Sequence, residues 1–355
     1  MEFIKPDINI DFIGRRKIAF IVSVVVILIG LAGLIWRGAS LYGIDFAGGT
    51  VIQLRFSNPT SANKIKEGLK PLGLDRSAIQ SFGGETENVF LIRTDLSRSE
   101  LGNISKEVKD SLERTYGENT VTVERVEMVG PKVGKDLRQK ALLAIYYALL
   151  FIAIYISGRF ELKWMAGLIM AGALMLGVYV LRSVGMSIPV LIIAALVITM
   201  ACCWVLRLKY ALGAVVALIH DVMITVGAFA LTNKEFDLTV VAALLTIIGY
   251  SLNDTIIVFD RIRENLRKSR KRDFGEVVNS SINQTLSRTI LTSGTTLGVV
   301  TALFILGGGV IHDFAFALMV GVVVGTYSSI FVASPVLIAW ETGFTTARVR
   351  ATGKR

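Results

Sequence analysis

Long apolar runs dominate this sequence. The hydrocarbon core of a bilayer is about 30 Å thick, and a helix needs about 20 mostly apolar residues to cross it. Most of the runs are uncharged through their middle, and 53% of the whole chain is hydrophobic, above the usual share for a soluble domain. The sequence therefore predicts a multi-pass α-helical membrane protein. Eight candidate spans lie near residues 17–36, 139–157, 164–181, 188–206, 211–231, 238–259, 289–306 and 314–338.

The net charge of +10 is explained by membrane topology rather than by nucleic-acid binding. Lys and Arg gather in alternate connections, as the positive-inside rule expects, and the intervening connections 232–237 and 307–313 are nearly free of them. Both termini and the 260–288 loop are therefore predicted to be cytoplasmic, and no nucleic-acid partner is expected. The cationic residues are Arg15, Arg16, Lys17, Arg261, Arg263, Arg267, Lys268, Arg270, Lys271, Arg272, Arg348, Arg350, Lys354 and Arg355.

The first apolar run and the two cysteines have plain structural interpretations. The run is about 19 residues long and no clear cleavage site follows it, so it is predicted to be a retained anchor rather than a signal peptide. Cys202 and Cys203 are neighbours in one predicted span. Adjacent side chains on a helix point about 100° apart, so these cysteines are expected to pack rather than to form a disulfide framework.

Residues 38–137 are predicted to form a separate α+β domain between the first two spans. The segment 50–57 alternates apolar and polar residues like a half-buried strand, and 97–117 carries apolar residues at helical spacing. The order β-α-β-β-α-β is typical of the ferredoxin-like arrangement. The charge rule places this domain on the periplasmic side. It shows no nucleophile with a base, no metal-ligand spacing and no phosphate loop, so it is predicted to be a binding or mechanical element and not an enzyme.

An Asp within the sixth apolar run is the first candidate functional residue. Ser251, Asp254 and Thr255 fall on one face of the expected helix, and Asn253 borders that face. Charged groups inside a bilayer are costly and usually face a bundle interior. A carboxyl group in such surroundings resists ionisation, so it can load a proton and release it. The alternative is that Asp254 and Asn253 only bridge helices through hydrogen bonds.

Two further polar sites lie in the apolar runs. Arg288 begins the seventh run; it could modulate the proton affinity of Asp254, or it could simply extend its charged end to the water boundary. His220 and Asp221 lie near the middle of the fifth run and form a second polar site. A structural role for this pair, as a cap or a bridge between helices, is the alternative to a role in proton transfer.

Glycines four residues apart occur twice in the last two runs. Gly294 and Gly298 form one G-x-x-x-G pattern, and Gly321 and Gly325 form the other. Small residues at this spacing allow transmembrane helices to approach closely. Packing is the favoured interpretation, and sliding surfaces for a moving bundle are the alternative.

At these motifs the sequence resembles SecF, the membrane subunit family of the bacterial SecDF protein-export complex. The resemblance covers nearly the whole chain, and its motifs are long and in the family's order. "GIDFAGGT" (43–50), with Gly43, Asp45, Gly48 and Gly49, matches the signature that follows the first span. "ALIHDVMITVGAFAL", "IIGYSLNDTIIVFDRIREN" and "LSRTILTSGTTL" match motifs of the later spans. The wider relation is to the resistance-nodulation-division superfamily.

The resemblance implies a function and a set of partners. It implies a subunit of the bacterial inner membrane that, with SecD, uses the proton motive force to assist late stages of Sec-dependent preprotein translocation. SecD, the SecYEG channel, YajC, unfolded preprotein and membrane lipid are the implied partners, with no cofactor and no metal. Asp254 and Arg288 are implied as proton-pathway residues, with Asn253, Ser251 and Thr255 beside them. The alternatives are a proton-driven small-molecule or lipid exporter half of the same superfamily, and a non-conducting translocon scaffold.

One departure from the family is expected. SecF proteins normally have six spans, whereas about 45 residues with two extra apolar runs intervene here. They are predicted to form a hairpin at the periphery of a surviving six-span core. The expected divisions are 1–37 (N-terminus and first span), 38–137 (periplasmic domain), 138–163 (second span), 164–209 (inserted hairpin), 210–340 (four-span core with the basic loop 260–288) and 341–355 (basic tail).

Overall fold

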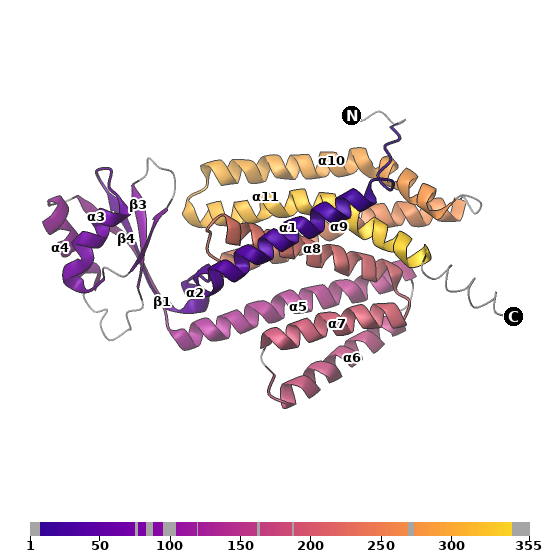
Figure 1. Ribbon diagram of the computed structural model, residues 1–355, viewed down its shortest axis with the longest axis horizontal. Helices are drawn as coiled ribbons and strands as arrows, with labels where there is room; N and C mark the ends of the chain where they lie inside the picture. The colour runs from indigo at the N-terminus through magenta and orange to yellow at the C-terminus, as the bar shows by residue number, and fades with distance from the viewer. Residues whose placement is uncertain are drawn as a thin grey trace.

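The computed structural model places a small α+β domain at one end of a long helical bundle (Figure 1). It describes residues 8–74, 77–82, 88–94, 104–118, 120–161, 164–186, 188–268 and 273–342. The start of the helix expected at 97–117, Lys163, the basic residues 270–272 and the basic tail 343–355 lie outside these ranges.

Long apolar helices form the bundle. Seven helices in the described residues are long and apolar enough to cross a membrane, and the eighth expected span is present as a shorter apolar helix, 190–205 within α7. The chain is thus a multi-pass helical membrane protein. The helices are α1 (Arg16–Arg37), α5 (Pro131–Glu161), α6 (Trp164–Ser183), α7 (Ile188–Val205), α8 (Lys209–Leu231), α9 (Leu238–Lys268), α10 (Phe274–Leu306) and α11 (Gly309–Ser328).

Three helices extend well beyond the expected spans. Helix α5 begins at Pro131 rather than near residue 139, with proline at the first helical position, where its missing N–H costs nothing. The 260–288 segment is not a long loop, because α9 continues to Lys268 and α10 already begins at Phe274. The Asp273 carboxylate caps α10 by accepting from the Gly275 N–H at 2.9 Å, and Val277, Val278 and Ile282 bury one face of the extension.

The α+β domain has the predicted ferredoxin-like topology. Its four strands are ordered β2-β3-β1-β4, and every neighbouring pair is antiparallel. On β1, Ile52, Leu54 and Phe56 point into the core, where Ile65 and Leu112 pack against them. The elements are α2 (Ile44–Ala47), β1 (Gly49–Phe56), α3 (Ala62–Leu69), β2 (Ala78–Phe82), β3 (Val89–Thr94), α4 (Ile104–Tyr116) and β4 (Val121–Val129).

The α6–α7 hairpin lies at the periphery of the bundle. Figure 1 shows both helices on the outer side of α5, away from α9, α10 and α11. Helix α6 packs on α5 and α7, and α7 also reaches α8. Met170, Leu174 and Cys203 of the hairpin are fully buried in the main apolar core. The hairpin therefore adds a layer to the bundle without entering its centre.

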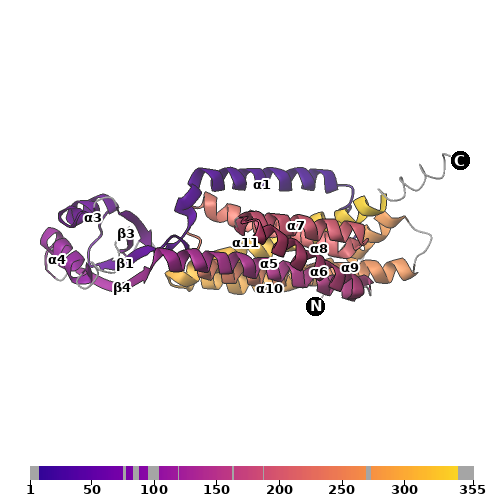
Figure 2. The same ribbon diagram turned by 90° about the horizontal axis from the view of Figure 1, so that it is seen from below.

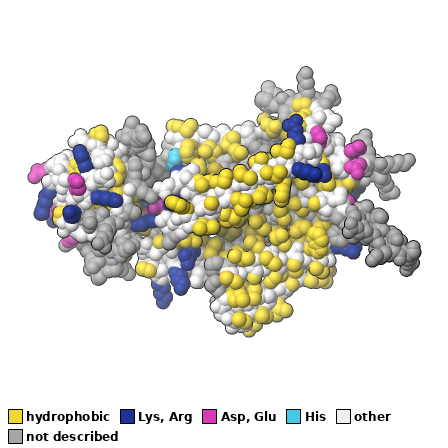
Figure 3. All heavy atoms as spheres, viewed as in Figure 1, with side chains coloured by type: hydrophobic (Ala, Val, Ile, Leu, Met, Phe, Trp, Pro, Cys, Tyr) yellow, Lys and Arg dark blue, Asp and Glu magenta, His cyan; other side chains and the backbone are white. Residues whose placement is uncertain are grey.

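Helix α1 lies along one side of the bundle (Figure 2). It crosses α8 at a glycine pair, where a Cβ on Gly30 would lie only 3.0 Å from the Cα of Gly227. Hydrophobic side chains cover α1 and the lower edge of the bundle, whereas charged side chains gather on the α+β domain and at the opposite end (Figure 3). This division between an apolar belt and two charged ends is that of a protein embedded in a bilayer.

Helix α11 does not continue as a uniform α-helix. A π-helical turn, Ser329–Ala333, follows it, and helix resumes to Thr342. The wider turn lets the Ser334 hydroxyl donate to the carbonyl of Ser329, five residues earlier, at 2.9 Å. Such turns inside long helices frequently occur at functional sites. This one begins directly after the serine that contacts a buried carboxylate, described next.

Candidate functional site

Asp221 lies at the centre of a buried network that joins four helices. Its carboxylate is completely buried. One oxygen, Oδ2, accepts hydrogen bonds from the Ser251 hydroxyl of α9 at 2.5 Å and from the Ser328 hydroxyl of α11 at 2.8 Å. The other oxygen, Oδ1, lies 2.9 Å from Nδ1 of His220. The carboxylate therefore has a polar partner on each side and needs no cation at its surface.

His220 extends the network to α1. Its Nε2 lies 3.0 Å from the Ser23 hydroxyl, which in turn lies 3.1 Å from the hydroxyl of Tyr327. The Tyr327 hydroxyl donates to the carbonyl of Ala19 at 2.8 Å. When Nδ1–H donates to Asp221, Nε2 is free to accept from Ser23, so both ring nitrogens are satisfied. Hydrogen bonds of His220 and Asp221 thus connect α8 with α1, α9 and α11.

Asp254 forms a second carboxylate site. It lies on α9, one turn after Ser251 of the first site. The side chain is 1% exposed. Its Oδ2 accepts from the Ser293 hydroxyl of α10 at 3.1 Å, and the Thr326 hydroxyl of α11 lies 2.7 Å from Ser293 Oγ and 3.5 Å from the carboxylate. The partners described around Asp254 are thus hydroxyl groups, which can both donate and accept. A carboxyl group held in this way can exist with or without its proton.

The other expected proton-pathway residues differ in burial. Thr255 is buried, like Ser251 and Asp254. Asn253 instead lies on the exposed face of α9. Arg288 is also exposed, and it forms no ion pair with Asp254 or with another carboxylate in the described ranges. In this conformation the network contains the carboxyl group and the hydroxyls but not the arginine.

The two glycine pairs differ. A Cβ on Gly321 would lie 2.3 Å from Cγ1 of Ile247, and one on Gly325 would lie 2.9 Å from the Cβ of Ser251. These glycines therefore let α11 approach α9 closely enough to bring Ser328 and Ser251 to the same oxygen of Asp221. Among the described residues, no neighbouring helix comes within 4 Å of a Cβ built on Gly294 or Gly298, so the close packing expected there is not seen.

Several residues of the network were not singled out from the sequence. Ser23, Ser293, Thr326, Tyr327 and Ser328 all contact the two carboxylate sites directly or through one neighbour. One signal was present: the run "TYSS" (326–329) places four hydroxyls inside an apolar segment, immediately after Gly325. Ser23 is an isolated polar residue in its run, and only the packing of α1 on α8 connects it to His220.

A row of buried hydroxyls continues along α10 from Asp254 toward the end of the bundle opposite the α+β domain. Ser281, Thr285, Thr289 and Ser293 recur every four residues, about 6 Å apart along the axis, and all are buried. Asn265 donates to Ser281 at 2.9 Å, at the far end of the row. The Thr289 hydroxyl is buried and has no hydrogen-bond partner among the described residues.

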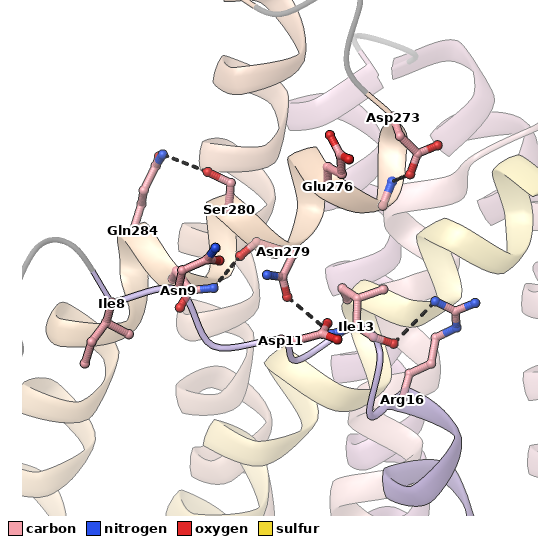
Figure 4. A pocket seen from close by; sticks show the side chains of 12 residues that line it. Ile8, Asn9, Asp11, Ile13, Arg16, Asp273, Glu276, Asn279, Ser280 and Gln284 are labelled. Carbon is pink, nitrogen blue, oxygen red and sulfur yellow. Dashed lines mark hydrogen bonds between the residues drawn. The ribbon is translucent and has the colours of Figure 1, made fainter.

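A pocket lies at the same far end, where the N-terminal segment meets α10 (Figure 4). Asn279 and Asn283 hold this segment by its backbone: both amides donate to the carbonyl of Ile10, at 3.0 and 2.9 Å. Their side-chain oxygens accept from Phe12 N and Ile10 N, both at 2.9 Å. These hydrogen bonds attach the segment before α1 to α10. The pocket beside them is lined mostly by polar residues.

Acidic residues also cluster at the opposite end, beside the α+β domain. Burial raises the pKa of Asp237 from 3.8 to about 6; the Val240 N–H opposes the shift, and the nearby Asp45 and Asp313 carboxylates add to it. Burial likewise raises the pKa of Glu235, against the opposing effect of Arg93. Within the described residues no group of three or more His, Cys, Asp or Glu is arranged to hold a metal ion.

We expect Asp237→Asn to stabilise the folded protein at neutral pH. The folded state binds the Asp237 proton near pH 6 and the unfolded state only near 3.8, so the contribution of this group to stability should rise as the pH falls from 7 to 4. Asparagine cannot ionise and still caps a helix. Its advantage should reach at most about 3 kcal/mol at pH 7.5 and vanish below pH 4. Melting temperatures across this range test the expectation, and a pH-independent difference would contradict it.

These features together define a class: a polytopic membrane protein with buried carboxylates in its helical bundle and an α+β domain inserted after its first span. The sequence model for the protein export membrane protein SecD/SecF, C-terminal, matches residues 107–199 and 181–343, and the two matches meet within the α6–α7 hairpin. The SecD/SecF GG motif matches residues 42–60. The chain belongs to the SecF family, whose members are named as protein translocase subunits and not as enzymes.

The relatives agree over nearly the full length. The protein translocase subunit SecF of Calditerrivibrio nitroreducens is 43% identical over 337 residues, which cover 94% of this chain and 95% of that protein. SecF of Magnetococcus marinus is 43% identical over 338 residues, covering 94% and 93%. The crystal structure of SecDF, a translocon-associated membrane protein from Thermus thermophilus, superposes with a TM-score of 0.74 at 32% identity. That match covers 96% of this chain, which spans only 40% of the solved SecDF chain.

Proposed function

We infer that this protein is the SecF half of a proton-driven export machine. With a SecD partner it uses the proton motive force to assist late stages of Sec-dependent preprotein translocation across the bacterial inner membrane. Both termini are cytoplasmic and the α+β domain is periplasmic. The observation that carries the inference is Asp254, a carboxyl group buried in the bundle whose described partners are hydroxyls and not a fixed cation. Because no cation is paired with this carboxyl group, protonating it leaves no buried positive charge without a partner.

The proposed cycle uses the residues around Asp254. Ser293 stabilises the carboxylate by donating to it, and Thr326 donates to Ser293 in turn. The Ser293 hydroxyl can also accept from the protonated form of Asp254. Arg288 lies five residues before Ser293 on α10, about 7.5 Å along the axis. In a second conformation its guanidinium would approach Asp254, favour the carboxylate and expel the proton. One charge crossing 100 mV supplies about 2.3 kcal/mol, enough to bias two conformations.

The buried hydroxyls on α10 supply a proton route from Asp254 to the cytoplasm. We expect Thr289→Val to lower the rate of proton-driven export about tenfold, because it removes one hydroxyl from the row, and a rise of about 1.4 kcal/mol in the barrier to proton transfer corresponds to that factor. Thr289→Ser keeps the hydroxyl and should restore the rate. Thr296→Val, on the same helix but off the row, is the matched control. Proton uptake by proteoliposomes measures the effect, and an unchanged Thr289→Val rate would argue against this route.

The SecD partner is proposed to dock against α9 and α10. Between Ala242 and Asn253, the exposed residues of α9 are small or polar. Gly294 and Gly298 on the neighbouring α10 are also open. Lipid satisfies an asparagine amide poorly, and exposed glycines leave room for another helix backbone. The α9 residues are Ala242, Thr246, Gly249 and Asn253.

The rivals are an exporter half of the same superfamily and a passive translocon scaffold. The α+β domain is small, and its described part contains one four-stranded sheet, so an export funnel would require much more protein. In the favoured function the domain instead holds emerging preprotein and prevents its return. SecYEG and YajC are the further proposed contacts. Neutralising Asp254 separates the three functions, and its expected result is given in the Discussion.

A further inference from the structure

Residues 41–49, which enter the α+β domain from α1, are joined by backbone hydrogen bonds to the loop before α9. The N–H of Gly43 donates to the carbonyl of Phe236 at 2.9 Å, and the N–H of Phe236 donates to the carbonyl of Leu41 at 2.7 Å. A Cβ on Gly43 would lie 3.2 Å from the Cβ of Asp237, so a larger residue would crowd this contact. Two segments almost two hundred residues apart thus move as one strand pair.

Asp45 completes the connection by capping α9. Its Oδ2 accepts from the N–H of Leu238, the first residue of α9, at 3.0 Å. The helix's own Asp237 accepts from Val240 N at 2.8 Å. The first N–H groups of a helix have no partner within the helix, so an acceptor oxygen there satisfies a group that would otherwise lack a hydrogen bond. One of the two caps of α9 is therefore supplied by the segment that leads into the domain.

Apolar packing makes the same connection rigid. Phe46 is buried in a small cluster with Ala141 of α5 and Val241 of α9. On the domain side, Gly48 has φ +79°, and a Cβ there would lie 2.8 Å from the Cα of Pro131, the first residue of α5. The segment that leads into the domain therefore packs directly against the first turns of α5 and α9.

An ion pair fastens the domain itself to the same loop. Arg93, near the end of β3, pairs with Glu235 and donates to the carbonyl of Tyr42 at 3.1 Å. Both charged side chains are largely shielded from solvent, with exposed fractions of 19% and 27%. A pair with this degree of burial holds its geometry better than an open surface pair.

These contacts connect the domain to the helix that carries the proton-binding candidate. Asp254 lies sixteen residues along α9 from Leu238, about 24 Å on one uninterrupted helix. Rigid helices transmit displacement along their length. We propose that residues 41–46 and the 235–238 loop form a joint that transmits movement of α9 to the α+β domain, with Asp45 as its positioning residue. This deepens the proposed function and rests on it.

The test measures the joint directly in the full-length protein in lipid nanodiscs. Spin labels are placed at Glu67→Cys on α3 and Ala242→Cys on α9, both exposed, after Cys202→Ala and Cys203→Ala. The unmodified joint should give one narrow distance distribution. Asp45→Ala should broaden it, whereas Asp45→Asn, which keeps an acceptor oxygen, should leave it narrow. Asp136→Ala, an exposed carboxylate on the neighbouring α5, is the matched control.

A second variant removes the same hydrogen bond from its other side. Leu238→Pro deletes the donor N–H, and proline is well tolerated at the first position of a helix. It should broaden the distribution as Asp45→Ala does, and the double variant should be no broader than either single one. Narrow distributions in both single variants would overturn the joint. A different result would contradict the proposed function alone. In that case Asp254→Asn would leave export unchanged, while Asp45→Ala would still broaden the distance distribution.

Discussion

Asp254→Asn should abolish the proton-driven component of preprotein export while leaving a folded protein. Asparagine has nearly the same shape, and its amide oxygen can still accept from Ser293. It cannot bind and release a proton at any accessible pH. A positioned proton-transfer group commonly contributes a factor of 10² or more, so we expect the stimulated rate to fall by about a hundredfold. The measurement is preprotein translocation into vesicles with and without an imposed proton gradient.

Asp260→Asn is the matched control for this experiment. It makes the same chemical change on the same helix, but Asp260 lies near the water boundary, where it pairs with Arg159 at 2.7 Å. Export should remain near the wild-type rate, since exposed pairs contribute little. If Asp254→Asn also exports normally under a proton gradient, the scaffold function replaces the proton-driven one. If it instead alters the accumulation of small molecules, the exporter function is favoured.

Asp221→Ala should be the most destabilising single substitution in the bundle. It removes the acceptor shared by Ser251, Ser328 and His220 and leaves a buried space among α8, α9 and α11. Breaking a buried charged network by removing one partner typically costs 3–5 kcal/mol. We expect a melting temperature well below that of the wild type in the same detergent. A loss below about 1 kcal/mol would show that the bridge does not hold these helices together.

Asp221→Asn separates the structural role of this residue from a role in proton transfer. The amide oxygen keeps one acceptor for the two serine hydroxyls, so much of the stability should remain. If this variant folds and exports normally, His220 and Asp221 act as a bridge only. If it folds but loses proton-driven export, the pair belongs to the same pathway as Asp254.

The local features of this protein could be predicted from sequence because they depend on near neighbours in the chain. Apolar runs of bilayer length predict membrane helices, and the β-α-β-β-α-β order predicts the sheet topology that is observed. The same applies to the face shared by Ser251, Asp254 and Thr255, because helical spacing alone places them together. The segment 260–288 was wrongly predicted as a loop because its many charges masked the buried stripe of Val277, Val278 and Ile282.

The partners of these residues were decided by packing between helices. The sequence positions of Ser23 and His220 do not predict their contact, and neither do those of Ser328 and Asp221. The close glycine contacts of α1 with α8, and of α11 with α9, bring these residues together. The same packing left Arg288 away from Asp254 and made Asp45 a cap of α9. The sequence determines which face of each helix is polar, because each residue is rotated by a fixed angle of about 100° from the one before it. Which polar faces meet depends on how closely backbones can approach, and that is set only when the whole bundle is assembled.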